Sequence, residues 1–168
     1  MKTITEEIKE ILEYYELQNT KQRLAEKRRD SFRRTRDNID NILSQKFYDW
    51  LSDNDESLKE NNITFSRDEG SISLIFDGFT IGISFSGSSN DKYQDSDATY
   101  EGFIKWTLFN LGKTATTGGT AYAYKGLSVN LDYTDDNLYL ERQITKKFSQ
   151  ERFKEIFLTS LRNSLLNL

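Results

Sequence analysis

The chain contains no cysteine, no histidine and no proline among its 168 residues. Without cysteine it can have no disulfide framework, no thiolate nucleophile and no sulfur-ligated zinc. Without histidine it lacks the commonest general base and the commonest metal ligand in proteins. Any metal would be held by oxygen ligands alone, which suits magnesium or calcium better than zinc. These absences argue against an enzyme, and we expect no cofactor.

Long hydrophobic runs are also missing. No segment approaches the roughly 18 to 20 consecutive apolar residues that span a bilayer. The N-terminal MKTITEEIKEILEYYE lacks the apolar run of a signal peptide. We therefore expect a cytoplasmic protein with no membrane partner. With 36% hydrophobic and 13% aromatic residues, the chain is long enough to form one domain around its own core.

The first fifty residues show the three- and four-residue spacing of a helix. Apolar residues follow this spacing in two stretches: Ile4, Ile8, Ile11 and Tyr15, then Ile39, Leu43, Phe47, Trp50 and Leu51. Between them the same heptad frame meets mostly polar residues: Gln18, Gln22, Ala25, Arg29, Phe32 and Arg36. Two arrangements fit this pattern. One is a single long helix, and the other is a helical hairpin that turns near residues 18–20, where Asn19 or Thr20 would cap the second helix.

From residue 62 the hydrophobic period changes to two, which is typical of strands. Apolar and polar residues alternate from Ile63 to Phe85, and Asp77-Gly78 is a two-residue hairpin signal. This pattern predicts an antiparallel meander. Further strands are expected at 100–109, around 121–124, at 127–133 and at 138–144, with 86–99 and 112–120 as mobile connections.

The C-terminal segment predicts a closing helix that Ser149 caps, with Phe148 and Phe153 as a hydrophobic staple. The expected fold is therefore α+β: a long N-terminal helix or helical hairpin over 1–60, then an antiparallel sheet and a C-terminal helix over 61–168. We expect a single compact domain, with the helical arm packed on it or projecting from it. The expected core comprises the meander and the closing helix, with these residues buried: Phe76, Ile81, Phe153 and Phe157.

Charge is distributed unevenly along the chain. The segment KRRDSFRRTRDN, residues 27–38, has six positive charges in a chain whose net charge is −4. Residues 1–20 have a net charge of −3 and residues 21–36 a net charge of +6. On a helix the positively charged side chains of residues 21–36 surround the axis. A helix that binds in a DNA groove instead concentrates its positive charges on one side. Three interpretations stay open: a helix that is simply solvated or is neutralised by the acidic N-terminal segment, a protein-binding or self-associating face, and a nucleic-acid-binding helix.

We favour the protein-binding reading, because the planar guanidinium of arginine pairs bidentately with carboxylates. In this hypothesis residues 21–36 form an exposed arm and Phe32 is its apolar anchor. The predicted contact residues are Arg28, Arg29, Phe32, Arg33, Arg34 and Arg36. A secondary interface is expected at Tyr93, which precedes Gln94, and at Tyr122 and Tyr124, which alternate with alanines. The alternative is that these tyrosines line the core.

Signals for catalysis are weak. Gly112-Lys113-Thr114 matches the last three residues of a phosphate-binding loop, but Thr107 occupies the position of the first glycine of that motif. The acidic residues Asp91, Asp95 and Asp97 lack the glycine hinge and the distal glutamate of a calcium loop. Carboxylates in or beside the expected strands show no spacing that selects a pair: Asp77, Glu101, Asp132 and Glu141.

The leading expectation is a non-catalytic protein-interaction module. Its partner would be another protein or a second copy of the chain bound through the N-terminal helix. One specific form is a phage or mobile-element accessory protein that inhibits a host nuclease or defence complex, in the manner of anti-CRISPR proteins. The alternatives are a nucleic-acid-binding protein that uses the arginine-rich helix 21–36, and a magnesium-dependent enzyme built on carboxylates only.

Overall fold

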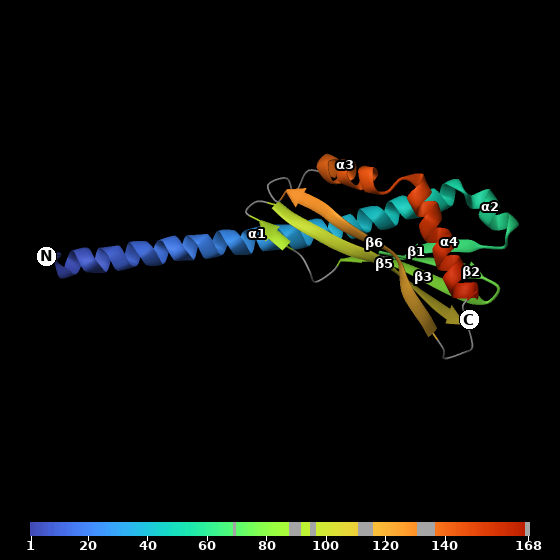
Figure 1. Ribbon diagram of the computed structural model, residues 1–168, viewed down its shortest axis with the longest axis horizontal. Helices are drawn as coiled ribbons and strands as arrows, with labels where there is room; N and C mark the ends of the chain where they lie inside the picture. Colours follow the sequence, from blue (N-terminus) through green and yellow to red (C-terminus); the bar gives the residue numbers. More distant parts are fainter. Residues whose placement is uncertain (69, 88–91, 95–96, 111–115, 131–136, 167–168) are drawn as a thin grey trace.

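The structure is a computed structural model that describes the chain except for residues 69, 88–91, 95–96, 111–115, 131–136 and 167–168 (Figure 1). Its helices are α1 (Ile4–Asp53), α2 (Asp55–Glu60), α3 (Asn137–Lys147) and α4 (Gln150–Leu166). Its strands are β1 (Thr64–Asp68), β2 (Ser71–Phe76), β3 (Phe79–Gly87), β4 (Lys92–Gln94), β5 (Asp97–Asn110) and β6 (Thr116–Asn130). The expected α+β class is confirmed.

The N-terminal region is one continuous helix of 50 residues, about 75 Å long at a rise of 1.5 Å per residue. The helical hairpin is therefore wrong, and Asn19 and Thr20 lie within α1. The segment contains neither glycine nor proline, the two residues that most often interrupt a helix. A capping box fixes its start, because Glu6 N donates to Thr3 Oγ1 at 3.3 Å and Thr3 N donates to Glu6 Oε2 at 2.9 Å.

The strands form one antiparallel sheet in the order β1-β2-β3-β5-β4, and β6 pairs with β5. The predicted meander is confirmed, with Phe65 opposite Leu74 and Leu74 opposite Ile81. Asp77 and Gly78 both adopt positive φ (48° and 77°), as the two central residues of a tight type I′ hairpin must. The hairpin signal in the sequence thus corresponds to the actual turn.

The core lies between one face of this sheet and the helices α1, α3 and α4. The ring of Phe47 on α1 is 6.0 Å from Phe85 on β3 and 5.6 Å from Phe153 on α4, so both helices cover the same face. Buried side chains alternate along β2, β3 and β5: Ile72, Leu74, Ile81, Ile83, Phe85, Ile104, Trp106 and Leu108. From α1 the buried apolar residues are Phe32, Ile39, Leu43, Phe47 and Leu51. The second half of α1 is therefore a central part of the domain.

Arg67 attaches the edge strand β1 to α1. Its guanidinium donates to Ser44 Oγ at 3.3 Å, to the Asn41 carbonyl at 3.4 Å and to Gln45 Oε1. On the other side of α1, Lys46 Nζ lies 3.6 Å from Glu141 Oε1 of α3. Polar contacts thus hold the second half of α1 on both flanks.

The predicted closing helix and its hydrophobic staple are confirmed, while the side-chain cap by Ser149 stays a prediction. Residues Gln150–Leu166 form α4, and the rings of Phe148 and Phe153 stack with centroids 5.9 Å apart, as a hydrophobic staple does. The Ser149 carbonyl accepts hydrogen bonds from the backbone N–H groups of Arg152 and Phe153. Of the predicted core residues Ile81, Phe153 and Phe157 are buried, whereas Phe76, next to the β2–β3 turn, is only partly buried.

Three predictions about the second half of the chain were wrong in part. The strand expected at 138–144 is the helix α3, in which Ile144 is buried and Phe148, four residues later, is buried just beyond its end. The loop expected at 86–99 contains β4 and the start of β5. The strands expected near 121–124 and 127–133 are one strand, β6, which begins at Thr116 within the segment 112–120. Residues 112–115 and 131–133 lie outside the described residues.

Candidate functional site: the exposed helical arm

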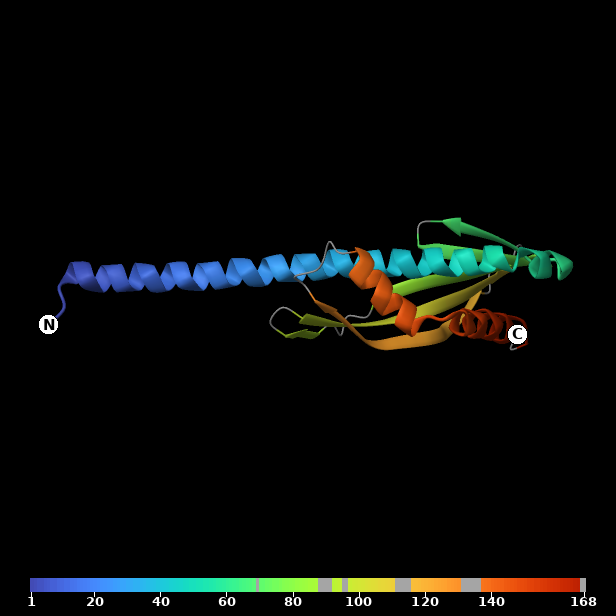
Figure 2. The same ribbon diagram turned by 90° about the horizontal axis from the view of Figure 1, so that it is seen from above.

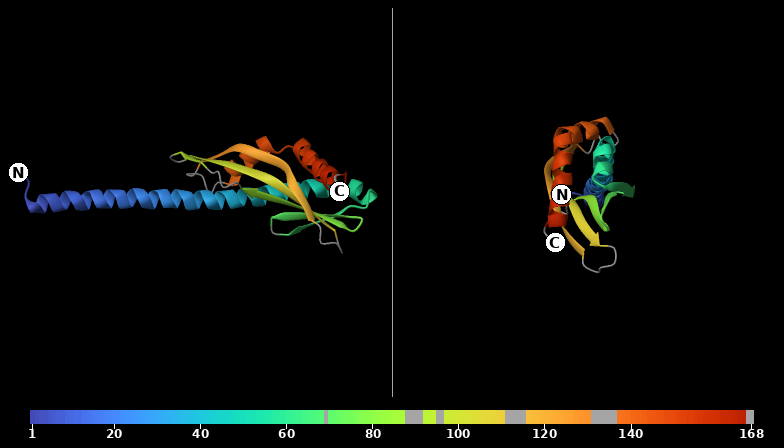
Figure 3. Two further views of the ribbon diagram at one scale, coloured as in Figure 1. Left: turned by 60° about the horizontal axis from the view of Figure 1, so that its bottom comes forward. Right: turned by 90° about the vertical axis from the view of Figure 1, so that its right-hand side faces the viewer.

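The first half of α1 forms a free helical arm, which we define as residues 4–30. Every residue of the arm is exposed, and burial begins only at residues 31 and 32. In Figures 2 and 3 this blue half of α1 extends well past the end of the sheet. At 1.5 Å per residue the arm is about 40 Å long. It is the part of the described molecule that is most available to a partner.

One side of the arm has an apolar stripe. The stripe consists of residues spaced by four and three, with these exposed fractions: Ile4 74%, Ile8 51%, Ile11 67% and Tyr15 63%. Such spacing places side chains on one face of a helix. Large apolar side chains at these positions are characteristic of a coiled-coil seam, and a seam is normally covered by another helix. No residue that the structure describes covers this one.

The charge of the arm changes sign at its middle. Residues 4–16 contain five glutamates and Lys9, a net charge of −4. Residues 17–29 contain five Lys or Arg residues and Glu26, a net charge of +4. The acidic half begins the helix and the basic half leads into the domain. Residues 4–29 together are therefore neutral but strongly polarised along the helix axis.

The predicted contact arginines lie at the base of the arm. Arg28, Arg29, Arg33 and Arg34 are exposed, and Arg36 is partly buried. Asp30 Oδ1 lies 3.4 Å from Arg33 Nη1, and Asp37 Oδ1 lies 3.7 Å from Arg36 Nε. Neutralisation by a folded-back acidic segment does not occur, because α1 is straight and continuous.

Phe32 is not the exposed apolar anchor that the sequence predicts. Its side chain is completely buried in the core of its own chain, with 0% exposure. The expectation that it is an exposed anchor was wrong, because the sheet already covers α1 at this level. Phe32 shares the heptad frame of Ile39 and Leu43, which was the available signal for a core position. The exposed apolar residues are instead Ile4, Ile8, Ile11 and Tyr15, which the sequence reading treated only as a helix seam.

The predicted tyrosines are distributed over two strands. Tyr93 lies on β4 opposite Ala98, while Tyr122 and Tyr124 lie on β6 opposite Ile104 and Gly102. The side chains of these three tyrosines lie outside what the structure describes. Their role in a secondary interface stays a prediction.

Of the residues considered for calcium binding, Asp97 begins β5, and Asp91 and Asp95 lie outside the described residues. The strand carboxylates considered as a catalytic pair lie on separate elements where they are described. Asp77 is in the β2–β3 turn, Glu101 is on β5 and Glu141 is on α3, while Asp132 lies outside the described residues. Within the described ranges no three His, Cys, Asp or Glu side chains are placed to hold a metal ion. The pKa of Lys59 is raised, first because its ammonium hydrogen-bonds the carboxylate of Asp55, 2.8 Å away on α2. That pair is exposed and lies at the opposite end of α1 from the arm.

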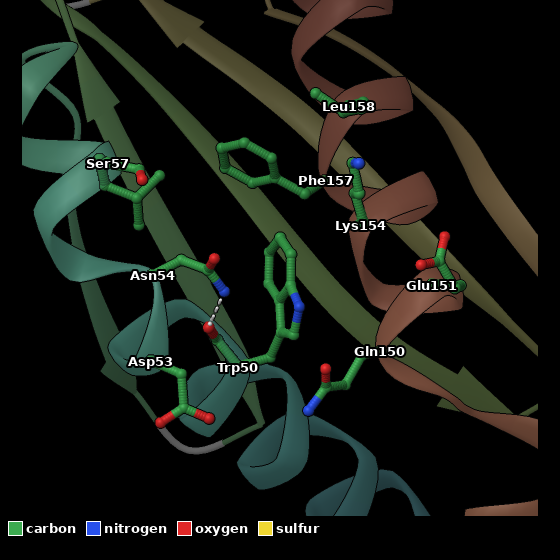
Figure 4. A pocket seen from close by; sticks show the side chains of 10 residues that line it. Trp50, Asp53, Asn54, Ser57, Gln150, Glu151, Lys154, Phe157 and Leu158 are labelled. Atoms are coloured by element: carbon green, nitrogen blue, oxygen red, sulfur yellow. Dashed lines mark hydrogen bonds between the residues drawn. The ribbon is translucent and has the colours of Figure 1, made fainter.

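A second surface feature is a cleft between the end of α1, α2 and α4 (Figure 4). It has a volume of about 520 Å³, and Trp50, Phe157 and Leu158 form its apolar wall. Asn54 Nδ2 donates to the Trp50 carbonyl at 2.8 Å and closes one side. A neighbouring hollow of about 390 Å³ shares Ser57, Leu58, Phe157 and Leu158 with it. Both hollows are lined in part by residues of α4.

None of the helices in the described part of the chain combines the length and apolarity needed to cross a membrane. Comparison with known proteins adds no assignment: no family model matches the chain, and no curated protein or solved structure is significantly similar to it.

Proposed function

We propose that the protein is a non-catalytic binding module that engages another protein chain through its helical arm. The observation that supports this most directly is the apolar stripe, which has four large side chains more than half exposed on an arm that contains no buried residue. Taking an apolar side chain of this size from full exposure to full burial is worth about 1.5–3 kcal/mol, and these four side chains have half to three quarters of their surface left to bury. The stripe can therefore supply most of the free energy of a specific helix–helix contact.

The limited stability expected of a lone helix also supports binding of a partner along the arm. Helices in proteins owe most of their stability to packing of an apolar face, and lone helices in water are marginal. The capping box and the first-turn residues Glu6 and Glu7 favour helix at the N-terminus, since acidic groups there complement the helix dipole. Binding a second helix along the stripe would stabilise the remainder. A partner helix along the stripe would thus supply the packing that the free arm lacks, as in recognition between amphipathic helices.

The proposal keeps the cytoplasmic location expected from the sequence. A phage or mobile-element role, such as inhibition of a host nuclease or defence complex, is its most specific form. That role is a hypothesis drawn from the sequence.

Two matched variants test the proposal. Ile8→Ser/Ile11→Ser removes the centre of the stripe, whereas Leu17→Ser/Leu24→Ser removes two exposed leucines (52% and 49% exposed) from the opposite face. We expect the first variant to lose association, measured by light scattering and by co-purification from cells that express the chain, and the second to retain it. Both should unfold at the wild-type temperature, because the arm adds nothing to the core. Equal association of wild type and both variants would show that the stripe is not the binding surface.

Nucleic-acid binding is the second candidate, because the basic half of the arm is exposed on all sides and Arg28, Arg29 and Arg34 make no ion pair with another described residue. Phosphate contacts make affinity fall steeply with salt. We expect the wild type to bind RNA and DNA weakly at about 150 mM salt. Tight binding at that salt, lost on Arg28→Gln/Arg29→Gln while protein association persists, would favour this candidate over the first.

A further inference from the structure

We infer that the partner of the arm is a second copy of the same arm, packed antiparallel so that residue i lies opposite residue 33−i of the other chain. The inference deepens the proposed function, since it rests on the arm being a protein-binding helix and adds the identity, direction and register of its partner.

The distribution of charge along the arm favours an antiparallel pair. The acidic half, residues 4–16 at −4, and the basic half, residues 17–29 at +4, are equal in length and opposite in sign about the midpoint between Glu16 and Leu17. An antiparallel pair with this midpoint on its two-fold axis places each acidic half against a basic half. A parallel pair places like halves together. At helix–helix distances, charge complementarity selects the partner's direction.

The stripe fits the same register. The frame that contains Ile4, Ile8, Ile11 and Tyr15 continues through Gln18, Gln22, Ala25 and Arg29. In the antiparallel pair Ile8 lies opposite the partner's Ala25 and Ile11 opposite the partner's Gln22. Each isoleucine thus meets a small side chain or the carbon atoms of a polar one, and the fading of the seam after Tyr15 is explained. In a parallel pair Arg29 would face its own copy at a seam position.

The position of the domain excludes the parallel pair on steric grounds. The seam frame continues into Phe32, Ile39 and Leu43, which are buried against the chain's own sheet. Axes of packed helices lie about 8–10 Å apart. In a parallel pair two sheets would have to fit between the two helices at the same level, where there is no room. In the antiparallel pair the partner's helix begins opposite Arg29, just before the sheet.

The length of the arm agrees with this register. The overlap runs from residue 4 to residue 29, and full exposure of α1 ends at residue 30. The antiparallel pair therefore covers the stripe of both chains and stops where each domain starts. On one flank of the seam, Glu7 and Arg28 directly precede the seam residues Ile8 and Arg29. In this register the partner's Arg28 is level with residue 5, about 3 Å along the axis from Glu7. The two side chains therefore face each other across the seam, once at each end.

Disulfide cross-linking tests the direction and the register together. The chain has no cysteine, so single-cysteine variants report one position each. We would make Ile8→Cys and Ala25→Cys as full-length chains, one with a mass tag, and oxidise each alone and both together with oxidised glutathione. Residues 8 of the two antiparallel chains are 17 positions apart, about 25 Å along the axis. A disulfide requires Cα atoms within about 7 Å.

We expect the mixture to give a mixed-mass dimer, while each variant oxidised alone stays monomeric on a denaturing gel. Cross-linking of each variant to itself, with none in the mixture, would show a parallel pair and overturn the inference, although the arm would still be a protein-binding helix. A wild-type chain that stays monomeric in light scattering at about 100 µM would also overturn it. In that case the co-purification comparison of Ile8→Ser/Ile11→Ser with Leu17→Ser/Leu24→Ser decides the proposed function separately.

Discussion

At the scale of single residues, the heptad frame of α1 contains side chains with opposite roles. Ile11 is 67% exposed and Phe32, 21 residues later in the same frame, is fully buried. The difference does not lie in the side chains or their spacing, but in whether the sheet reaches that turn of the helix. Truncating each side chain should therefore have very different effects on the fold.

We predict that Phe32→Ala lowers the free energy of unfolding by about 3–5 kcal/mol, because it leaves a cavity in the core. Ile11→Ala should change it by less than about 0.5 kcal/mol, since exposed positions rarely contribute more. Urea unfolding of dilute protein, followed by tryptophan fluorescence, measures both. Similar losses for the two variants would contradict the boundary that we place between arm and domain.

A second residue-scale prediction concerns two buried hydroxyl groups, those of Ser160 on α4 and Thr35 on α1. Ser160 is 0% exposed, and its Oγ has no hydrogen-bond partner among the described residues. Ser160→Ala should therefore be neutral or stabilising by up to about 1 kcal/mol. Thr35 is the contrasting case, because its Oγ1 donates to the Ser31 carbonyl at 2.9 Å. Thr35→Val should be the more destabilising of the two changes in the same unfolding assay.

At the scale of elements, the two halves of α1 differ in what stabilises them. Residues 31–53 pack on the sheet and are held by Arg67 and Glu141, whereas the arm has only its own backbone and side chains. Local stability in a protein follows such differences in packing.

We predict that amide protons of the arm exchange with solvent much faster than those of residues 39–51 at low protein concentration. Raising the concentration should slow exchange in the arm alone, because pairing with a second chain covers it. Hydrogen exchange with mass-spectrometric detection resolves the two segments. Uniform protection along all of α1 at low concentration would contradict this view.

The elements also show how far the sequence predicts the fold. The meander and the closing helix were predictable, because alternation, the Asp77-Gly78 turn and the Phe148–Phe153 staple are local signals. The helix α3 was not, because the apolar residues at 138, 140 and 144 fit a strand or a helix and its residues Glu141 to Lys147 are mostly polar. The stripe itself was visible in the sequence. Its exposure was not, because the extent of the sheet along α1 is a tertiary property.

At the scale of the whole molecule, the proposed pair is a two-fold dimer with a domain at each end. Its charge arrangement gives a specific prediction. Glu7→Lys should weaken dimerisation roughly three- to tenfold, because it places two cations side by side at both ends of the seam. Glu7→Lys/Arg28→Glu should restore most of the affinity, since the pair is reversed and not removed.

Sedimentation equilibrium of the wild type and both variants measures these affinities. Arg34→Glu, on the outer side of α1 at the base of the arm, is the matched control and should leave the dimer unchanged. Failure of the double variant to recover affinity would contradict the predicted contact between Glu7 and Arg28.

The arm also has a hydrodynamic consequence. A rod about 40 Å long fixed to a domain makes the chain tumble anisotropically and diffuse more slowly than a sphere of its 19.7 kDa mass. Gel filtration separates by Stokes radius, so a single chain should elute ahead of a globular standard of equal mass. Early elution therefore cannot be read as dimerisation for this protein, whereas the frictional ratio from sedimentation velocity directly reports the extended shape of α1.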